Sequence, residues 1–454
     1  MKRLIKIVPI LLFSFLLISC NKKNIETKDT ITIPDTSIPT EKESETKVSK
    51  TTVIVREEYS SEIMDSYLDS LISNTYEYYP RWNLEGFKNR WNYIDGVFLK
   101  SVIDKYNISK DEKYINFVIT YVDYYINNNG YFVCPDKTSA NQIPFVDTEL
   151  DSICESRILF DLYEYTLDER YKTAIEFTYD ALMKYPTLEN GYSYYHKVIY
   201  PYQLWLDGMY MYVPFLSRYA LYKNDMTIFD TIKKQYEYMR LHMYNSDYGL
   251  YYHGYDDSKT IFWSDKTTGC SKSFWLRSMG WYLASLADLL EYVPADNSNR
   301  EYFVNLYKEA IDGILKYKDK DTNMFYQVID KGNISILISN DKYLQYFRNP
   351  YIYDTEISNY LESSGSLLVA YSILKCANMS VLSEEYRTIG ENIFLGTYNH
   401  SYYNHALNDI CITAGLGPED KPYRDGTMDY YLSEPVGTND AKGVGPFIMA
   451  YLQM

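Results

Sequence analysis

The feature that most limits how this chain can fold is a long series of helical patterns separated by short breaks rich in Gly, Asn, Asp or Pro. Within each pattern apolar residues recur three and four positions apart, as at Leu159, Leu162 and Tyr163, which is the spacing of one buried helix face. Strand-like alternation is short and local, so we expect an all-α fold. Twelve helices are predicted, near residues 58–78, 92–106, 110–127, 149–166, 168–184, 207–222, 226–244, 274–293, 299–317, 357–377, 383–397 and 445–454.

Twelve helices joined by short turns can close into an (α/α)6 barrel of six inner and six outer helices, or stack as an open solenoid. A solenoid should show internal similarity at a fixed period, and the sequence shows none. The longer connections, at 185–205, 245–273 and 319–353, carry aromatic, His, Asp and Gly residues. Loops of that length in a compact domain are usually functional, and they would line one mouth of a barrel. These observations favour the barrel.

The N-terminus has the features of a bacterial lipoprotein signal peptide. Lys2, Arg3 and Lys6 precede an apolar run over residues 7–18, and Cys20 follows one residue later. A permanent membrane anchor is the alternative, but the run is too short to span a bilayer. We therefore expect residues 1–19 to be removed and Cys20 to carry a lipid.

The rest of the chain divides into a tether and one large domain. Residues 20–52 contain almost no large apolar residue, so we expect the lipidated cysteine to be followed by a disordered tether. No second linker interrupts residues 53–454, which we assign to the barrel. The expected location is the bacterial cell envelope, in the periplasm or on the outer membrane, with the N-terminal lipid as the only membrane contact.

Composition excludes several classes of function. The net charge of -16 at pH 7 argues against nucleic-acid binding, which needs a basic surface. The six Cys and five His residues show neither CxxC nor HExxH spacing, so we expect no disulfide framework and no metal site. The 53 Tyr residues exceed the needs of a core; Tyr suits stacking on sugar rings, although codon bias can produce the same excess.

A single acid, Asp207, stands among aromatic residues and methionines in residues 200–211 (YPYQLWLDGMYM). Burial by such neighbours raises the pKa of a carboxyl, which allows a general acid to hold its proton near neutral pH. The alternative is that Asp207 caps the sixth predicted helix, because Asp is favoured at helix starts. Pro214 lies within that helix, so we expect a kink there or a later helix start.

Eight short motifs point to a known family. They occur in the same order as in that family, from about Trp91 to the end of the chain, and are residues 191–197 (GYSYYHK), 203–208 (QLWLDG), 251–256 (YYHGYD), 275–281 (WLRSMGW), 411–417 (CITAGLG), 424–427 (RDGT), 430–435 (YYLSEP) and 443–446 (GVGP). Together they resemble glycoside hydrolase family 105, the unsaturated rhamnogalacturonyl hydrolases and their relatives. The resemblance implies an (α/α)6 barrel that removes a 4,5-unsaturated uronic acid from the non-reducing end of oligosaccharides left by a polysaccharide lyase.

The reaction that the resemblance implies is the hydration of a vinyl ether. An acid protonates C4, positive charge develops at C5, and water adds at C5. The resulting hemiketal opens and releases the rest of the sugar chain. This chemistry needs one proton donor that afterwards assists water, instead of two opposed carboxylates, and it needs no metal or organic cofactor.

The resemblance also assigns site residues. Asp207 matches the catalytic Asp, and Asp151 matches a second active-site Asp that would hold sugar hydroxyls and perturb the pKa of Asp207. Residues 154–156 (CES) replace the Asn-Pro-Gly expected after Asp151, and Asp151 could instead stabilise the first turn of the fourth helix. Seven residues match substrate-binding positions: Tyr93, His196, Lys197, His253, Trp275, Arg277 and Trp281.

Each of these residues has a structural alternative. The two tryptophans could be core residues, and Arg277 and Lys197 could form ion pairs. However, an anionic substrate in so acidic a protein needs local donors. Arg is the best bidentate ligand for a carboxylate, and Trp faces suit sugar stacking.

Three other functions remain open from the sequence. One is an unsaturated glucuronyl hydrolase acting on other uronate polysaccharide fragments. Another is an inverting glycosidase, which needs a second carboxylate such as Asp256, Asp257 or Glu362. The third is a non-catalytic sugar-binding lipoprotein. For all of them the expected partner is an oligosaccharide, and we expect the protein to be a monomer that binds no nucleic acid.

Overall fold

The computed structural model describes residues 27–31, 52–75, 91–133, 145–337 and 356–454. The predicted signal peptide, Cys20 and most of the predicted tether lie outside these residues. One part of the tether is described: Thr27–Ile31 forms strand β1, which pairs antiparallel with β2 (Thr52–Arg56). The Thr and Ile residues of this segment favour an extended backbone, which the expectation of disorder throughout the tether overlooked.

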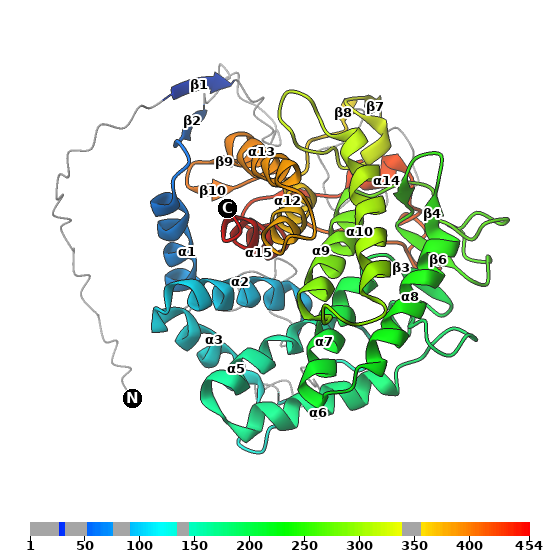
Figure 1. Ribbon diagram of the computed structural model, residues 1–454. Coiled ribbons are helices and arrows are strands. Elements are labelled where there is room, and N and C mark those ends of the chain that lie inside the picture. The colour runs from blue at the N-terminus through cyan, green and yellow to red at the C-terminus, as the bar shows by residue number, and fades with distance from the viewer. Residues whose placement is uncertain (1–26, 32–51, 76–90, 134–144, 338–355) are drawn as a thin grey trace, which may run out of the picture.

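Helices dominate the described chain, as predicted (Figure 1). A central set is linked by a circuit of contacts: α9 packs against α7 and α12, α12 against α15, α15 against α2, α2 against α4, and α4 against α7. These helices are α2 (Tyr93–Ser109), α4 (Asp151–Ser156) with its continuation α5 (Ile158–Thr166), α7 (Gly208–Lys223), α9 (Leu276–Tyr292), α12 (Ser363–Asn378) and α15 (Ala441–Tyr451).

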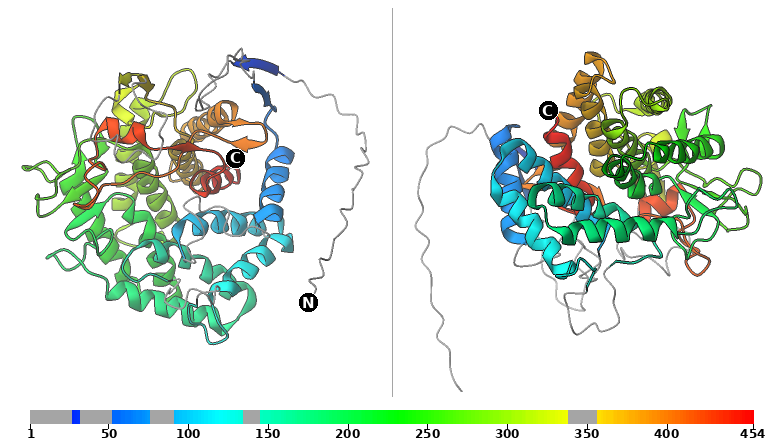
Figure 2. Two further views of the ribbon diagram at one scale, coloured as in Figure 1. Left: turned by 180° about the vertical axis from the view of Figure 1, so that it is seen from behind. Right: turned by 60° about the horizontal axis from the view of Figure 1, so that its bottom comes forward.

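A second set of helices covers the first. Each packs against one central element: α1 on α15, α3 on α2, α6 on α4 and α5, α8 on α7, α10 on α9, and α13 on α12. The contact of α1 with α15 joins the two ends of the described chain, visible as blue beside red in Figures 1 and 2. The bounds are α1 (Ser61–Thr75), α3 (Glu112–Tyr125), α6 (Glu169–Met183), α8 (Thr227–Met243), α10 (Arg300–Ile314) and α13 (Glu384–Ser401).

The central and the peripheral helices differ in how much of each helix is buried. In α9 every residue from Leu276 to Leu290 is buried, as expected for a helix with protein on all sides. In α10, by contrast, the buried residues Phe303, Leu306, Tyr307 and Ala310 follow one helical stripe. The central helices therefore form the core, and the peripheral helices each bury one face against it.

Each helix predicted from the sequence is present, with a few changes at the ends. The fourth predicted helix is interrupted at Arg157. Helix α12 begins at Ser363 instead of near 357, because the side chain of Glu362 accepts hydrogen bonds from the backbone N–H groups of Ser364 and Gly365. Helix α15 begins at Ala441 instead of near 445, with Asp440 as its cap.

Helix α7 runs through Pro214, from Gly208 to Lys223. The alternative of a helix start at or after Pro214 was therefore wrong. Proline removes only one backbone donor, and the surrounding turns of α7 are buried on both sides of it.

The remaining elements are short. Helix α14 (Met428–Ser433), which the sequence did not predict, and several two-stranded antiparallel ribbons lie in the connections between helices. The ribbons are β3 (Gln203–Trp205) with β6 (Gly254–Asp256), β4 (Tyr244–Asn245) with β5 (Leu250–Tyr251), β7 (Ser335–Leu337) with β8 (Glu356–Ser358), β9 (Tyr402–Tyr403) with β10 (Ala406–Leu407), and β11 (Ile410–Cys411) with β12 (Val436–Gly437).

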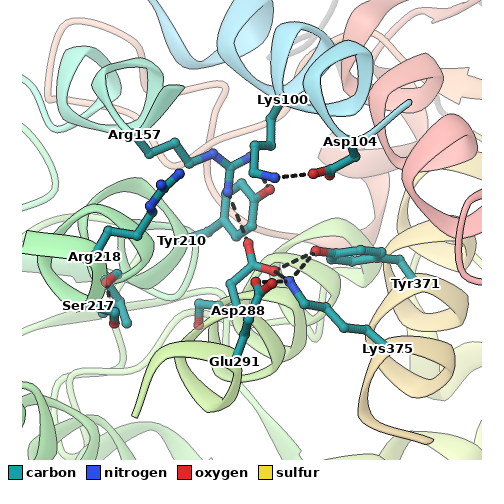
Figure 3. A network of polar contacts seen from close by, with 12 residues as sticks. Lys100, Asp104, Arg157, Tyr210, Ser217, Arg218, Asp288, Glu291, Tyr371 and Lys375 are labelled. Carbon is teal, nitrogen blue, oxygen red and sulfur yellow. Dashed lines mark hydrogen bonds and ion pairs between the residues drawn. The ribbon is translucent and has the colours of Figure 1, made fainter. Parts of the chain in front are cut away.

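A buried network of charges connects the central helices (Figure 3). Asp288 on α9 accepts from Arg157 at 3.0 Å, from Lys375 on α12 at 2.7 Å and from the hydroxyl of Tyr371 at 2.5 Å. Arg157 also donates to the hydroxyl of Tyr210 on α7, at 2.5 Å. Burial alone would raise the pKa of the Asp288 carboxyl, but Lys375 and Arg157 outweigh it and hold the pKa below its usual value.

We predict that Asp288→Asn strongly destabilises the fold. The amide preserves the shape of the side chain but leaves Arg157 and Lys375 without their shared buried anion. Removing one partner of a buried ion pair typically lowers the free energy of unfolding by about 3–5 kcal/mol. Urea unfolding at pH 7 measures this loss. The exposed Asp180 provides a control, since Asp180→Asn should change stability by less than about 0.5 kcal/mol.

The stability difference between wild type and Asp288→Asn should also depend on pH. Because the folded-state pKa of Asp288 is lowered, its stabilisation is fully present above the unfolded pKa of about 3.9 and is lost as the pH falls through the folded value. The stability difference between wild type and Asp288→Asn should therefore be constant above about pH 5 and shrink below about pH 4. A difference that persists unchanged in acid would contradict this role of Asp288.

Candidate active site

A pocket of about 210 Å³ opens where several central helices begin. The first residues of α2, α4 and α9 line it, together with Asp207 immediately before α7 and the segment that follows β11. Helix N-termini carry partial positive charge, so this arrangement suits an anionic ligand. The lining residues are Asn92, Tyr93, Ile94, Asp151, His196, Lys197, Tyr200, Trp205, Asp207, Met211, Trp275, Arg277, Thr413, Ala414, Lys421 and Arg424.

Asp207 occupies the N-cap position of α7, but its side chain makes no capping hydrogen bond. The capping alternative is therefore wrong. Its Oδ2 atom instead lies 3.2 Å from Nε2 of His253. Both atoms are buried, and no other polar group of the described residues bonds to either of them. The carboxylate of Asp207 thus lines the pocket without capping helix α7.

The pKa of Asp207 differs from the sequence-based expectation. Burial by itself raises the pKa of this carboxyl, but the neighbouring His253, with a smaller effect from His196, outweighs burial and holds the pKa below its usual value. The expectation that the surroundings of Asp207 raise its pKa is therefore wrong for the protein alone. The sequence neighbours of Asp207 are indeed apolar, but the decisive neighbour comes from residue 253.

The pairing of β3 with β6 brings His253 to Asp207. In this ribbon Trp205 lies opposite Gly254, and one step further the N–H of Leu206 donates to the carbonyl of His253 at 2.9 Å. The Nδ1 atom of His253 lies 2.6 Å from the hydroxyl of Tyr431 on α14. His253 is fully buried and is not among the residues that line the pocket. It therefore supports Asp207 from behind.

Asp151 belongs to a cluster of three charges at the pocket wall. Nζ of Lys197 lies 2.7 Å from Oδ2 of Asp151 and 2.7 Å from Oε2 of Glu149. Asp151 is also the first residue of α4, where a negative charge is favourable. The structure thus places both predicted residues at the pocket, and it shows that the ammonium group of Lys197 already has two carboxylate partners.

His196 stacks on Trp205, with ring centroids 4.2 Å apart and an interplanar angle of 11°. Tyr200 continues this stack, its ring 5.0 Å from that of Trp205. Burial, and to a lesser degree the positive charge of Lys197, lowers the pKa of His196 to about 3. His196 is therefore neutral near pH 7, so that it can accept or donate a hydrogen bond without adding charge.

Arg277 brings a positive charge to the pocket. Its guanidinium carbon is 4.8 Å from the ring centroid of Trp275, and Nη1 donates to the hydroxyl of Ser364 at 3.3 Å and to the carbonyl of Cys411. Its Nε atom is buried without a hydrogen-bond partner among the described residues. An arginine held this firmly, with donor capacity left over, can receive a carboxylate.

Of the two remaining predicted residues, one lines the pocket. Tyr93 lines the pocket. Trp281 lies beneath the pocket, with its ring centroid 6.2 Å from that of Tyr93 and 4.6 Å from that of Tyr210. Trp281 therefore connects the pocket wall to the buried charge network. This position matches the structural alternative considered for that residue.

Two basic pocket residues, Lys421 and Arg424, were not predicted individually. Arg424 donates through Nε to the carbonyl of Gly415 at 3.2 Å and to Tyr430 at 3.4 Å. A Cβ atom at Gly415 would lie 2.2 Å from Nη2 of Arg424 and 3.0 Å from the ring of Trp205, so a larger residue there would displace the guanidinium group of Arg424. Arg424 stands in the RDGT motif, which was available as a signal.

The carboxylates considered for an inverting glycosidase lie away from the pocket. Asp256 accepts from the N–H groups of Thr260 and Ile261 in its own loop, and Asp257 accepts from two tyrosine hydroxyls. Glu362 is used entirely as the cap of α12 and as acceptor for the N–H of Cys411. None of the three lines the pocket.

The described residues contain neither a cluster suited to a metal ion nor a helix that could cross a membrane. Groups of three or more His, Cys, Asp or Glu side chains arranged to hold a metal ion are absent there. Within the same residues, no helix combines the length and the apolar character needed to cross a membrane.

The sequence and the fold were compared with known proteins. The model of Glycosyl Hydrolase Family 88 matches residues 67–337 and 346–454. A family 105 glycoside hydrolase from C. acetobutylicum superposes with a TM-score of 0.72 at 30% identity, covering 87% of this chain and 99% of that one.

Two curated relatives have named activities. The unsaturated rhamnogalacturonyl hydrolase YesR of Bacillus subtilis is 20% identical over 319 residues, which is 69% of this chain and 79% of that protein. An unsaturated 3S-rhamnoglycuronyl hydrolase of Formosa agariphila is 30% identical over 122 residues, 26% of this chain and 31% of that protein. The chain therefore belongs to glycosyl hydrolase family 88 and to the family 105 glycoside hydrolases that its sequence motifs resemble.

Proposed function

We propose that the protein removes a 4,5-unsaturated uronic acid from the non-reducing end of lyase-generated oligosaccharides of the rhamnogalacturonan or pectin type, by hydrating the C4=C5 double bond. The observation that carries the proposal is the position of Asp207: a pocket carboxylate that caps no helix and faces a buried histidine. The names of the relatives from Bacillus subtilis and Formosa agariphila also support an unsaturated uronate substrate.

In this proposal Asp207 delivers a proton to C4 and then assists the water that attacks C5. His253 lies 3.2 Å from Asp207 in a buried site and lowers the pKa of this carboxyl in the protein alone. The substrate brings its own carboxylate into the pocket, and a like charge nearby raises the pKa of a carboxyl. Substrate binding thus raises the pKa of Asp207, which favours the protonated carboxyl that the reaction needs.

The remaining pocket residues bind and orient the sugar. Arg277, together with Lys421 and Arg424, supplies the positive charge that an anionic ligand requires in so acidic a protein. Asp151, held by Lys197, accepts hydrogen bonds from sugar hydroxyls. Trp205 and Trp275 add apolar surface to the pocket wall.

We also propose that the central helices close into the inner ring of an (α/α)6 barrel. The contact circuit through α2, α4, α7, α9, α12 and α15 supports closure, as does the pairing of each central element with one peripheral helix. The pocket then lies at the mouth formed by the helix N-termini.

An unsaturated glucuronyl hydrolase remains the second candidate. Such an enzyme would use the same pocket chemistry. Its substrate differs in the sugar that follows the unsaturated residue. It also differs in the C4 configuration of the uronate before lyase action, a difference that the double bond removes. Assays with unsaturated disaccharides from pectin, ulvan and glycosaminoglycan lyases distinguish the two by their relative kcat/KM.

We predict that Asp207→Asn abolishes turnover but preserves binding. An amide cannot deliver a proton, so kcat should fall by about 10²- to 10⁴-fold or more, while the fold is kept because Asp207 caps no helix. Loss of the ultraviolet absorbance of the conjugated double bond measures turnover, and calorimetry measures binding.

Asp256→Asn is the matched control for that experiment, since Asp256 is a buried carboxylate outside the pocket. It should retain turnover. A folded Asp207→Asn protein that still consumes the double bond at the wild-type rate would rule out the proposed acid. Wild-type protein that binds but never converts any unsaturated oligosaccharide would favour the sugar-binding alternative.

We predict that Arg277→Lys lowers kcat/KM for the unsaturated uronate about tenfold, although the charge is preserved. A lysine cannot present the planar guanidinium donors, and a hydrogen bond to a charged group contributes about 1.5–3 kcal/mol. Steady-state kinetics measure the change. Arg240→Lys, which alters an exposed two-bond contact with Glu309, should leave the kinetics unaltered; equal effects of both substitutions would show that Arg277 has no special role.

We propose that the protein is a lipoprotein of the bacterial cell envelope, on the basis of the N-terminal sequence alone. Cys20→Ser should then release the protein from the membrane fraction without loss of activity, because the lipid is the expected anchor. Immunoblots of membrane and soluble fractions measure the distribution. A variant that stays in the membrane fraction would contradict the lipid anchor.

A further inference from the structure

The turn at residues 200–203, which leads into strand β3, contains one residue with an unusual backbone conformation, Tyr202. Gln203 donates its N–H to the carbonyl of Tyr200 at 3.2 Å, which closes a four-residue turn with Pro201 in the second position. Tyr202, in the third position, has a φ of 65°. Proline followed by a left-handed residue is the pattern of a type II turn, in which the third position favours Gly or Asn.

A tyrosine is costly in this conformation. A bulky side chain with positive φ is strained, and glycine would adopt the same backbone freely. The backbone around Tyr202 is held in place from both sides, because its carbonyl accepts from the N–H of Asp257 at 3.0 Å and Gln203 is paired in the β3–β6 ribbon. The turn therefore forces Tyr202 into a conformation that its side chain disfavours.

The side chain of Tyr202 does not repay this strain by packing in the core. It is 44% exposed, and its ring contacts that of Tyr195, 5.7 Å away between centroids. The adjacent Val198 and Ile199 are also exposed, at 38% and 65%. This short stretch therefore presents apolar and aromatic surface to the outside of the protein.

The stretch is flanked by residues of the pocket wall. Lys197 and Tyr200, which bracket Val198 and Ile199, line the pocket. Tyr202 follows Tyr200 by two residues, so their Cα atoms are at most about 7 Å apart. The pocket itself, at about 210 Å³, is smaller than the roughly 300–1,000 Å³ of sites that enclose drug-sized ligands. It can enclose one sugar, and the rest of an oligosaccharide must leave over the rim.

We propose that Tyr202 and Tyr195 form an aromatic platform at the rim of the pocket that binds the part of the oligosaccharide outside it. This subsite rests on the proposed function, because it places the unsaturated residue in the pocket. Flat aromatic faces suit the apolar faces of sugar rings. The platform makes the protein prefer longer oligosaccharides over substrates that consist of the terminal uronate alone.

The test compares two substrates that share the same unsaturated uronate, its methyl glycoside and a tetrasaccharide. In Tyr202→Gly, the KM for the tetrasaccharide should rise about 2- to 10-fold, the usual range for one aromatic contact. The KM for the methyl glycoside should be unaltered. Tyr202→Phe keeps the ring and should behave as wild type with both substrates.

Stability separates the platform from a structural role. Tyr202→Gly should raise the melting temperature, because glycine relieves the strained φ. Leu167 is a matched control: it also has positive φ, at 56°, is 74% exposed and ends helix α5. Leu167→Gly should raise the melting temperature without changing either KM.

Three results would overturn the platform. They are an unaltered KM for the tetrasaccharide in Tyr202→Gly, an equal rise in KM for both substrates, or a fall in melting temperature that accompanies the loss of affinity. Wild-type protein that converts neither substrate would instead overturn the proposed function, and the platform with it. The two failures are therefore distinguishable.

Discussion

The ion pairs of Asp288 hold the central helices in register. This carboxylate is 3% exposed and binds two cations, Arg157 and Lys375, from other central elements. Because buried charges are stable only when they are paired, none of the partners can move far without a large loss of free energy. Helices α4, α7, α9 and α12 are joined in this way, directly or through Tyr210 and Tyr371. The pocket is built from residues at the N-terminal ends of the first three of these helices.

The β3–β6 ribbon determines which side chain lies next to Asp207. Its register brings His253 to Asp207 and forms the turn that carries Tyr202. A histidine beside a buried carboxylate explains why the pKa of Asp207 is lowered despite burial. The geometry of the pocket thus depends on a contact between two connections that the central helices hold in place.

The sequence predicted those features that depend on neighbouring residues. The helices follow from the spacing of apolar residues along the chain, and the caps Glu362 and Asp440 are local signals that would have given the correct starts of α12 and α15. The buried ion pair of Arg157 could not be predicted, because its partner Asp288 is 131 residues away. The resemblance to the family identified seven of the sixteen residues that line the pocket. It could not show that His253 lies behind Asp207, because that position depends on strand pairing.

The central claim is that a proton is added to C4 of the unsaturated uronate. The most direct measurement is NMR spectroscopy of the product formed in D₂O, recorded before slow exchange next to the new carbonyl group. The proposed mechanism places one deuterium at C4, in only one of the two hydrogen positions, since an enzyme-held acid protonates a single face. Release of a free uronate that still contains the double bond and carries no deuterium at C4 would contradict the account, because that product results from ordinary glycosidic cleavage at C1.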